Sequence, residues 1–341
     1  VLGRFCLRRS LRLDPPYFLV IGLTLLTFPL VGRGIVSTVG PVALVAHLGS
    51  GVDAYASAGQ HTFENLTVTA NGTAAGAGVE TAGLRLGGDG NRVDRCVISG
   101  NDGAGVMVAW TFASNTITRN RMSGNGPASG QIGIDLQAAG DDPATGTAPY
   151  RTRNDLNDAD AGANGLLNFP VVQSAVLANG NFTIAGWARP GSAIELFVAA
   201  PDPSGFGEGE TYVGTFVEGS AADLENWTAP YSGPINGLDQ GADDTQRFKF
   251  TIPVPAGVGP GVALTATATL AAGTSEFSGV VTVSAGVAVS GWGYADLDHD
   301  AQRDAGESGP GIAAWAKLVS PLTPAVAWDV AAIDAGSGAY A

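Results

Sequence analysis

The chain has 341 residues, enough for two or three domains, and it combines 50 glycines with only 14% charged residues, which is typical of β structure with many turns. Residues 1–50 carry five arginines and one acid, whereas the rest of the chain carries 12 basic and 30 acidic side chains. This balance argues against nucleic-acid binding, because phosphate contacts need clustered cations, and two cysteines exclude a scaffold built from disulfides.

Residues 1–50 are predicted to be a leader, either signal-like or unstructured. The basic stretch RFCLRRSLR precedes YFLVIGLTLLTFPLV, 15 residues without a charge. Basic then apolar is the order of a secretory signal peptide, and 15 residues is short for a membrane span. No small-x-small cleavage site follows soon after Val31, so a segment outside the fold is the alternative. We expect a secreted or cell-surface protein that touches a membrane only through this leader, if it is retained.

Residues 51–140 contain a repeat that predicts a solenoid. FENLTVTAN (63–71), VDRCVISGN (93–101) and ITRNRMSGN (117–125) align at offsets of 30 and 24 residues. The alignment gives four columns, which are Phe63, Val93 and Ile117; Leu66, Cys96 and Asn120; Val68, Ile98 and Met122; and Asn71, Asn101 and Asn125. In a parallel stack the apolar columns fill the interior, and the last asparagine column can hydrogen-bond along the stack. A second short strand recurs as GLRL, GVMV and GIDL.

The segments NRVDRCVISGN and SNTITRNRMSGN resemble the right-handed parallel β-helix repeats of bacterial extracellular proteins. The resemblance covers residues 55–140. Three coils make a short stack, which buries little surface unless its ends are capped. Either residues 35–60 add a degenerate coil, or a longer helix precedes this chain.

Residues 141–165 are predicted to be an acidic linker, because Pro, Gly, Asp and Asn crowd it. The spacing of Asp155, Asp158, Asp160 and Asn164 could hold a cation, and the alternative is a solvated loop.

Residues 166–285 are predicted to form an immunoglobulin-like β-sandwich, because six or seven short runs of period-two character alternate with turns. Residues 230–246 are expected to be a long polar loop. Trp187 and Trp227 are interpreted as strand aromatics rather than sugar-binding residues. PDPSGFGEGETYVGT and LTATATLAAGTSEFS look like the module that often follows parallel β-helix repeats in secreted bacterial proteins, and NDADAGANGLLNFP looks like the junction before it.

Residues 286–341 are predicted to be part of a third domain with a calcium loop, DLDHDAQRDAGE. Oxygen ligands recur at positions one, three, five, seven, nine and twelve of this loop, a spacing that can wrap around Ca²⁺. The predicted ligands are Asp296, Asp298, Asp300, Gln302 through its backbone carbonyl, Asp304 and Glu307. Ala301 and Arg303 depart from the usual glycine and apolar residue, and a solvated acidic turn is the alternative.

The stretch YADLDHDAQRDAGESGPGI resembles the start of the B-type repeat domains of collagen adhesins and serine-aspartate repeat proteins. The resemblance implies a partial B-type β-sandwich, with the five acidic residues of this loop as calcium ligands.

Two functions remain open from the sequence. The first is a non-catalytic, bacterial cell-surface protein that acts as stalk, spacer or adhesive surface toward a polysaccharide or protein, with structural calcium. The second is a polysaccharide lyase or hydrolase that uses the face of the β-helix. Its candidate residues are Asp89, Asp94, Arg92, Arg95, Arg119 and Arg121, which an exposed β-helix face also explains. The sequence contains no GxSxG, HExxH or P-loop motif.

Overall fold

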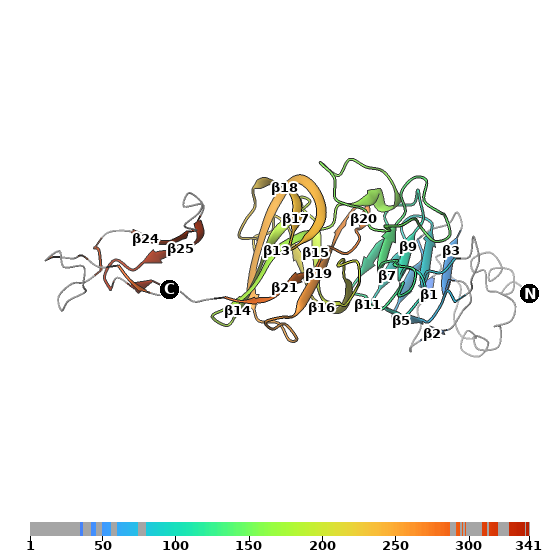
Figure 1. Cartoon of the computed structure of the whole chain (residues 1–341), viewed down its shortest axis with the longest axis horizontal. Coiled ribbons are helices and arrows are strands. Elements are labelled where there is room, and N and C mark those ends of the chain that lie inside the picture. The colour runs from blue at the N-terminus through green and yellow to red at the C-terminus, as the bar shows by residue number, and fades with distance from the viewer. Residues whose placement is uncertain are drawn as a thin grey trace, which may run out of the picture. The chain divides into compact units, whose positions relative to one another are not determined.

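A computed structural model describes most of the chain after residue 50 and a few residues before it. The described residues are 35–36, 42–45, 50–55, 60–73, 80–286, 291–293, 295, 297, 309–311, 314–319, 327–337 and 339–340. The chain divides into two units, residues 1–285 and 286–341. Nearly all regular structure is β, as the sequence predicts, and the first unit contains a parallel β-helix-like stack and a β-sandwich (Figure 1).

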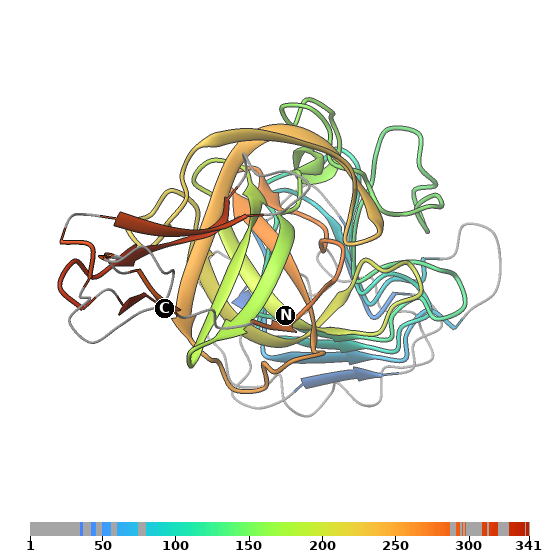
Figure 2. The same ribbon diagram turned by 60° about the vertical axis from the view of Figure 1, so that its left-hand side comes forward.

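The described part of the stack has four coils, and each coil gives one short strand to each of three parallel sheets (Figure 2). The sheet orders are β1-β4-β7-β10, β11-β8-β5-β2 and β12-β9-β6-β3. The strands are β1 (Ile35–Val36), β2 (Val42–Val45), β3 (Val52–Tyr55), β4 (Thr62–Glu64), β5 (Leu66–Thr69), β6 (Leu84–Gly87), β7 (Arg92–Asp94), β8 (Val97–Ser99), β9 (Val106–Val108), β10 (Thr116–Thr118), β11 (Arg121–Ser123) and β12 (Ile134–Leu136).

The strand register confirms two of the four columns read from the repeat. Val93 pairs with Phe63 on one side and Ile117 on the other, and Ile98 pairs in the same way with Val68 and Met122. These side chains are buried, so like residues from successive coils pack on one another inside the stack.

Strands β1, β2 and β3 supply a further coil, the first of the two alternatives. Val42 pairs with Leu66, and Val52 pairs with Leu84, in register with the coil that follows. Strands β1 and β2 precede residue 51, so the described stack includes part of residues 1–50, the segment that the sequence predicts to be a leader.

The sandwich consists of two five-strand sheets that are mostly antiparallel. One has the order β17-β18-β14-β13-β22, and the other has the order β16-β15-β19-β20 with β21 paired to β19. The strands are β13 (Val171–Ala178), β14 (Asn181–Ala188), β15 (Ala193–Ala200), β16 (Glu208–Val217), β17 (Thr228–Ile235), β18 (Leu238–Pro253), β19 (Ala263–Leu270), β20 (Gly273–Thr274), β21 (Val281–Thr282) and β22 (Ser284–Ala285). Phe182, Leu196, Phe248 and Leu264 are among the buried side chains of its core.

The expectation of a long polar loop at residues 230–246 is wrong. This segment forms a hairpin, in which Ile235 of β17 pairs with Leu238 of β18. Asn236 and Gly237 both have positive φ, 55° and 79°, as a tight two-residue hairpin turn requires. The polar side chains of this segment lie on the two faces of paired strands and not in a loop.

The second unit contains two small antiparallel pairs among its described residues. The pairs are β23 (Gly291–Trp292) with β26 (Ala339–Tyr340), and β24 (Ala314–Val319) with β25 (Ala327–Ile333). The described portion of the whole chain contains no helix with the length and apolar character needed to cross a bilayer.

Candidate functional site

Two ladders of buried asparagines run along the stack. In the first, the Nδ2 of Asn71 donates to Oδ1 of Asn101 at 2.8 Å, and Asn101 donates to Asn125 at 2.7 Å. In the second, Asn91 donates to Asn115 at 2.8 Å. The first ladder is the predicted one. An amide suits this position because it donates to one neighbouring coil and accepts from the other.

Each ladder ends on a residue outside the coils. Asn125 donates to the carboxylate of Glu208 on β16, with 2.6 Å between Nδ2 and Oε1. The backbone N–H of Asn115 donates to Oδ1 of Asn164, in the 3-10 helix η2 (Ala163–Leu166). Nδ2 of Asn164 donates to the carbonyls of Asn115 and Thr274, so this amide closes a ladder instead of joining the predicted cation site.

The sandwich caps the last coil with buried acceptors. The exposed edge of a stack leaves backbone N–H groups without partners, and such groups are costly when they are buried. Three glutamates and one threonine of the sandwich accept these hydrogens. The pairs are Arg119 N to Glu195 at 2.7 Å, Asn125 N to Glu208 at 3.1 Å, Leu136 N to Glu276 at 3.1 Å and Ile117 N to Thr274 at 2.9 Å.

Burial shifts the titration of the three capping glutamates. It raises the pKa of Glu208 to about 7, raises the pKa of Glu195, and raises that of Glu276 well above its ordinary value. Each carboxylate nevertheless accepts one or more backbone N–H groups, which favour its charged form. This arrangement could not be predicted from the sequence, because a glutamate in a strand or a loop looks the same whether it meets solvent or another module.

Three of the four predicted ligands in residues 141–165 do come together. Oxygens of Asp155, Asp158 and Asp160 lie within 4.8 Å of one another. Asp155 also accepts from the backbone N–H of Ala159, and Asp158 accepts from that of Asn168. Oδ1 of Asp160 is buried and has no hydrogen-bond partner among the residues that the structure describes.

The acidic cluster, defined as Asp155, Asp158 and Asp160, is electrostatically unfavourable by itself. Burial, and then the charges of Asp155 and Asp158, raise the pKa of Asp160 to about 6. Burial also raises the pKa of Asp158. A divalent cation would relieve both the repulsion and the missing partner, and carboxylate oxygens are the ligands that hard cations prefer. The predicted loop ligands, Asp296, Asp298, Asp300, Gln302, Asp304 and Glu307, lie outside the described residues.

Three of the candidate lyase or hydrolase residues, all arginines, surround the buried carboxylate of a fourth candidate, Asp94. Asp94 is fully buried, and Arg119 holds it with two hydrogen bonds of 2.9 Å. Arg92 lies 2.6 Å from the same carboxylate and Arg95 lies 3.1 Å from it. Arg95 also pairs with Glu64.

The chemistry of this arginine cluster favours structure over catalysis. An arginine that acts as a catalytic base needs a pKa lowered toward neutrality, so that its guanidinium can be deprotonated and accept a proton from the substrate. The hydrogen bond that Arg95 donates to the carboxylate of Glu64 and the charge of Asp94 instead raise the pKa of Arg95. The other two candidates lie elsewhere, since Asp89 accepts from the backbone N–H of Ala113 and Arg121 pairs with Glu210.

The two tryptophans singled out in the sandwich differ. Trp187 is buried, as expected for a strand aromatic, and the guanidinium of Arg247 lies 4.2 Å from its ring centre. Trp227 precedes β17 and is 54% exposed. The guanidinium of Arg247 also lies 5.9 Å from the ring centre of Trp227, and the exposure of this side chain alone indicates no ligand.

Comparisons with known proteins add no family to these observations. Neither the protein-family models nor the curated proteins compared with the chain match it. The functional argument therefore depends on the residues and their geometry.

Proposed function

We propose that the chain is a non-catalytic, secreted or cell-surface modular protein whose stacked β modules act as stalk, spacer or adhesive surface. The observation that carries the proposal is the capped junction between β-helix and sandwich. Glu195, Glu208 and Glu276 bind backbone N–H groups across it, so the two modules are joined by buried polar contacts. Such a joint resists bending, which suits a spacer.

The same contacts argue against the lyase or hydrolase. Glycoside hydrolysis needs two carboxyl groups that reach a substrate, and elimination by a lyase needs a base that reaches a substrate proton. The capping glutamates are buried and face backbone groups, and Asp94 is enclosed by arginines. A screen of the full chain for release of reducing ends or unsaturated products from polysaccharides should therefore be negative, and cleavage lost in Asp94→Asn would support the enzyme instead.

The order of the modules supports a bacterial extracellular setting. A β-helix repeat, a sandwich and a loop with B-type character follow one another, in the order that the sequence resemblance implies. Within this proposal the partner is a polysaccharide or protein of a cell surface or matrix.

Calcium is the proposed structural cofactor. The loop ligands Asp296, Asp298, Asp300, Gln302, Asp304 and Glu307 form the first proposed site on the basis of their spacing. The acidic cluster is a second place where calcium could bind, supported by the convergence of its carboxylates and the unpartnered oxygen of Asp160.

Thermal melts with calcium and with chelator test the cofactor at both places. Calcium should raise the melting temperature of the second unit, and Asp300→Ala should abolish that gain. Asp160→Asn should raise the melting temperature of the first unit in chelator, because it removes repulsion, and should reduce the gain on adding calcium.

Asp102→Asn is the matched control, because Asp102 is exposed and its carboxylate lies outside both sites. Melts that calcium leaves unchanged in every variant would remove calcium from the proposal.

A further inference from the structure

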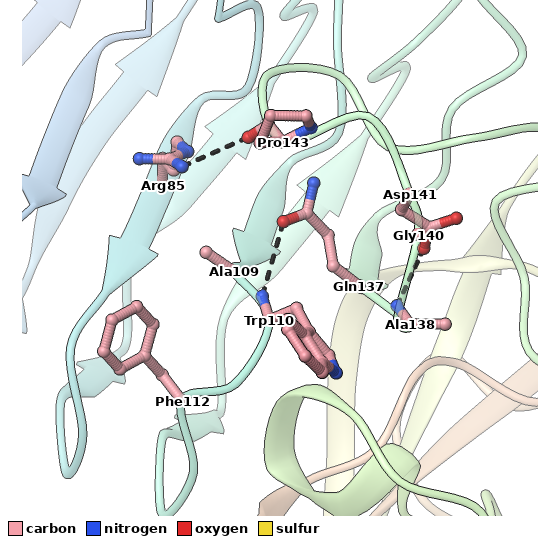
Figure 3. A pocket seen from close by; sticks show the side chains of 9 residues that line it. All are labelled: Arg85, Ala109, Trp110, Phe112, Gln137, Ala138, Gly140, Asp141 and Pro143. Carbon is pink, nitrogen blue, oxygen red and sulfur yellow. Dashed lines mark hydrogen bonds between the residues drawn. The ribbon is translucent and has the colours of Figure 1, made fainter.

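A pocket of about 240 Å³ lies beside the ends of β6, β9 and β12, on the outside of the stack (Figure 3). The loop after β12 closes one side of it. The residues used in the argument below are Arg85, Trp110, Phe112, Gln137, Asp141 and Pro143. None of them belongs to the junction, the acidic cluster or the arginine cluster.

One wall of the pocket is aromatic. Trp110 is 50% exposed, and Phe112 is partly buried beside it. Burying a tryptophan is strongly favourable, so an indole left half in water at the edge of a pocket is a surface that a ligand can cover. Its flat face suits a ring with an apolar side.

Gln137 and Asp141, which also line the pocket, offer it one donor and one acceptor. The buried amide of Gln137 accepts from the backbone N–H of Trp110 at 3.4 Å and donates to the carbonyl of Asp142 at 2.7 Å. These bonds fix the amide and leave one N–H hydrogen without a partner among the described residues. Oδ2 of Asp141 accepts from the backbone N–H of Ala138 at 2.7 Å, and Oδ1 accepts nothing from the described part of the chain.

The charges around the pocket disfavour an anion. Arg85 is the positively charged residue among those that line the pocket. The carboxylates of Asp53 and Glu80 lie 3.5 and 3.4 Å from its guanidinium. Arg85 also donates to the carbonyl of Pro143 at 3.1 Å. With Asp141 at the rim, the local balance is negative, so a phosphate or uronate would be repelled.

The volume of the pocket further restricts the class of ligand that it can hold. Pockets for drug-sized ligands have volumes of roughly 300–1,000 Å³. A smaller pocket with an aromatic wall, a donor and an acceptor fits one polar ring that has an apolar face and vicinal hydroxyl groups.

We propose that this pocket binds one neutral pyranose unit of a glycan, stacked on Trp110 and hydrogen-bonded through its hydroxyl groups to Gln137 and Asp141. The inference rests on the proposed function in one respect, since it supplies the ligand class for an adhesive surface. It needs neither the calcium site nor the capped junction.

The test measures retention of the full chain on immobilised oligosaccharides. The neutral probes are cellotriose, maltotriose, mannotriose and chitotriose in its N-acetylated form, and trigalacturonate is the acidic probe. We expect at least one neutral probe to bind, with affinity lowered about tenfold or more in Trp110→Ala and about threefold in Trp110→Phe, because the phenyl ring keeps part of the stacking surface.

Trp227→Ala is the matched control, because it removes a tryptophan of similar exposure outside the pocket. It should bind like the unchanged chain. Retention of no neutral probe, preference for trigalacturonate, or equal binding by Trp110→Ala and Trp227→Ala would overturn the proposal. Circular dichroism of each variant checks the fold, and the calcium-dependent melt reports the proposed function independently of any sugar result.

Discussion

Single buried polar residues hold the coils of the stack together and join them to the sandwich. Asn125 occupies the meeting point, because its carbonyl accepts from Asn101 and its amide donates to Glu208. A buried donor or acceptor that loses its partner costs about 1–3 kcal/mol, and more when the group is charged.

Asn125→Ala should therefore lower the free energy of unfolding of the first unit by about 3 kcal/mol, since it leaves the Asn101 amide without its acceptor and removes the side-chain donor to Glu208, which keeps only backbone N–H donors. Urea unfolding monitored by circular dichroism measures the change. Asn181→Ala is the control, because Asn181 is exposed on β14, and its effect should stay within about 0.5 kcal/mol. Equal effects of the two substitutions would contradict the ladder's role.

Glu208 should make the first unit more stable at pH 5 than at pH 8. Burial raises its pKa to about 7 from its ordinary 4.5. A carboxyl with a raised pKa in the folded state contributes stability that is present below pH 4.5 and lost as the pH rises through about 7. The raised pKa values of Glu195 and Glu276 act in the same direction.

Glu208→Gln should flatten this dependence, because the amide keeps the shape but does not titrate. The urea midpoint at pH 5 and pH 8 is the measurement. Glu210→Gln, on the same strand but partly exposed, should leave the dependence in place. A pH profile of Glu208→Gln that matches the unchanged chain would contradict the assignment.

At the scale of elements, the last coil of the stack depends on contacts with the sandwich for its stability. Strands β10, β11 and β12 have a neighbouring coil on one side only. On the other side they meet β16, β20 and the glutamates that cap their backbone N–H groups.

A chain that ends at residue 165 should therefore fail to fold cooperatively, because it keeps every coil but lacks all four caps. Size-exclusion chromatography and circular dichroism should show aggregation or loss of the β signal. A cooperative melt within a few degrees of that of the full chain would show that the coils need no cap.

The elements that repeat could be predicted from the sequence, and those that meet across long separations could not. The columns through Val93 and Ile98 were visible because the same residue type recurs at fixed offsets. The hairpin at Asn236 carried the Asn-Gly signal of a tight turn, but the polar character of its strands suggested a loop.

The candidate sites were harder to predict for a physical reason. The caps join residues 76 or more positions apart, such as Arg119 and Glu195, and no local pattern encodes such a pairing. The convergence of Asp155, Asp158 and Asp160 could be predicted because all three lie in one short loop. Asn164 instead bonds Asn115, at the end of the second asparagine ladder, which the aligned repeat segments do not contain.

At the scale of the whole molecule, the chain divides into two units. In the first unit, the β-helix and sandwich share a buried polar junction and should open together. The proposed function depends on this coupling, because a spacer that bends or opens at its joint would not hold its two ends at a fixed distance.

Native-state hydrogen exchange measures the coupling most directly. The backbone amides of Ile117, Asn125 and Leu136 donate to sandwich side chains, and they should exchange with the same free energy of opening as core amides of β14 and β19. Exchange of these three amides through an opening that leaves β14 and β19 protected would contradict the claim that the sandwich and the stack form one cooperative body.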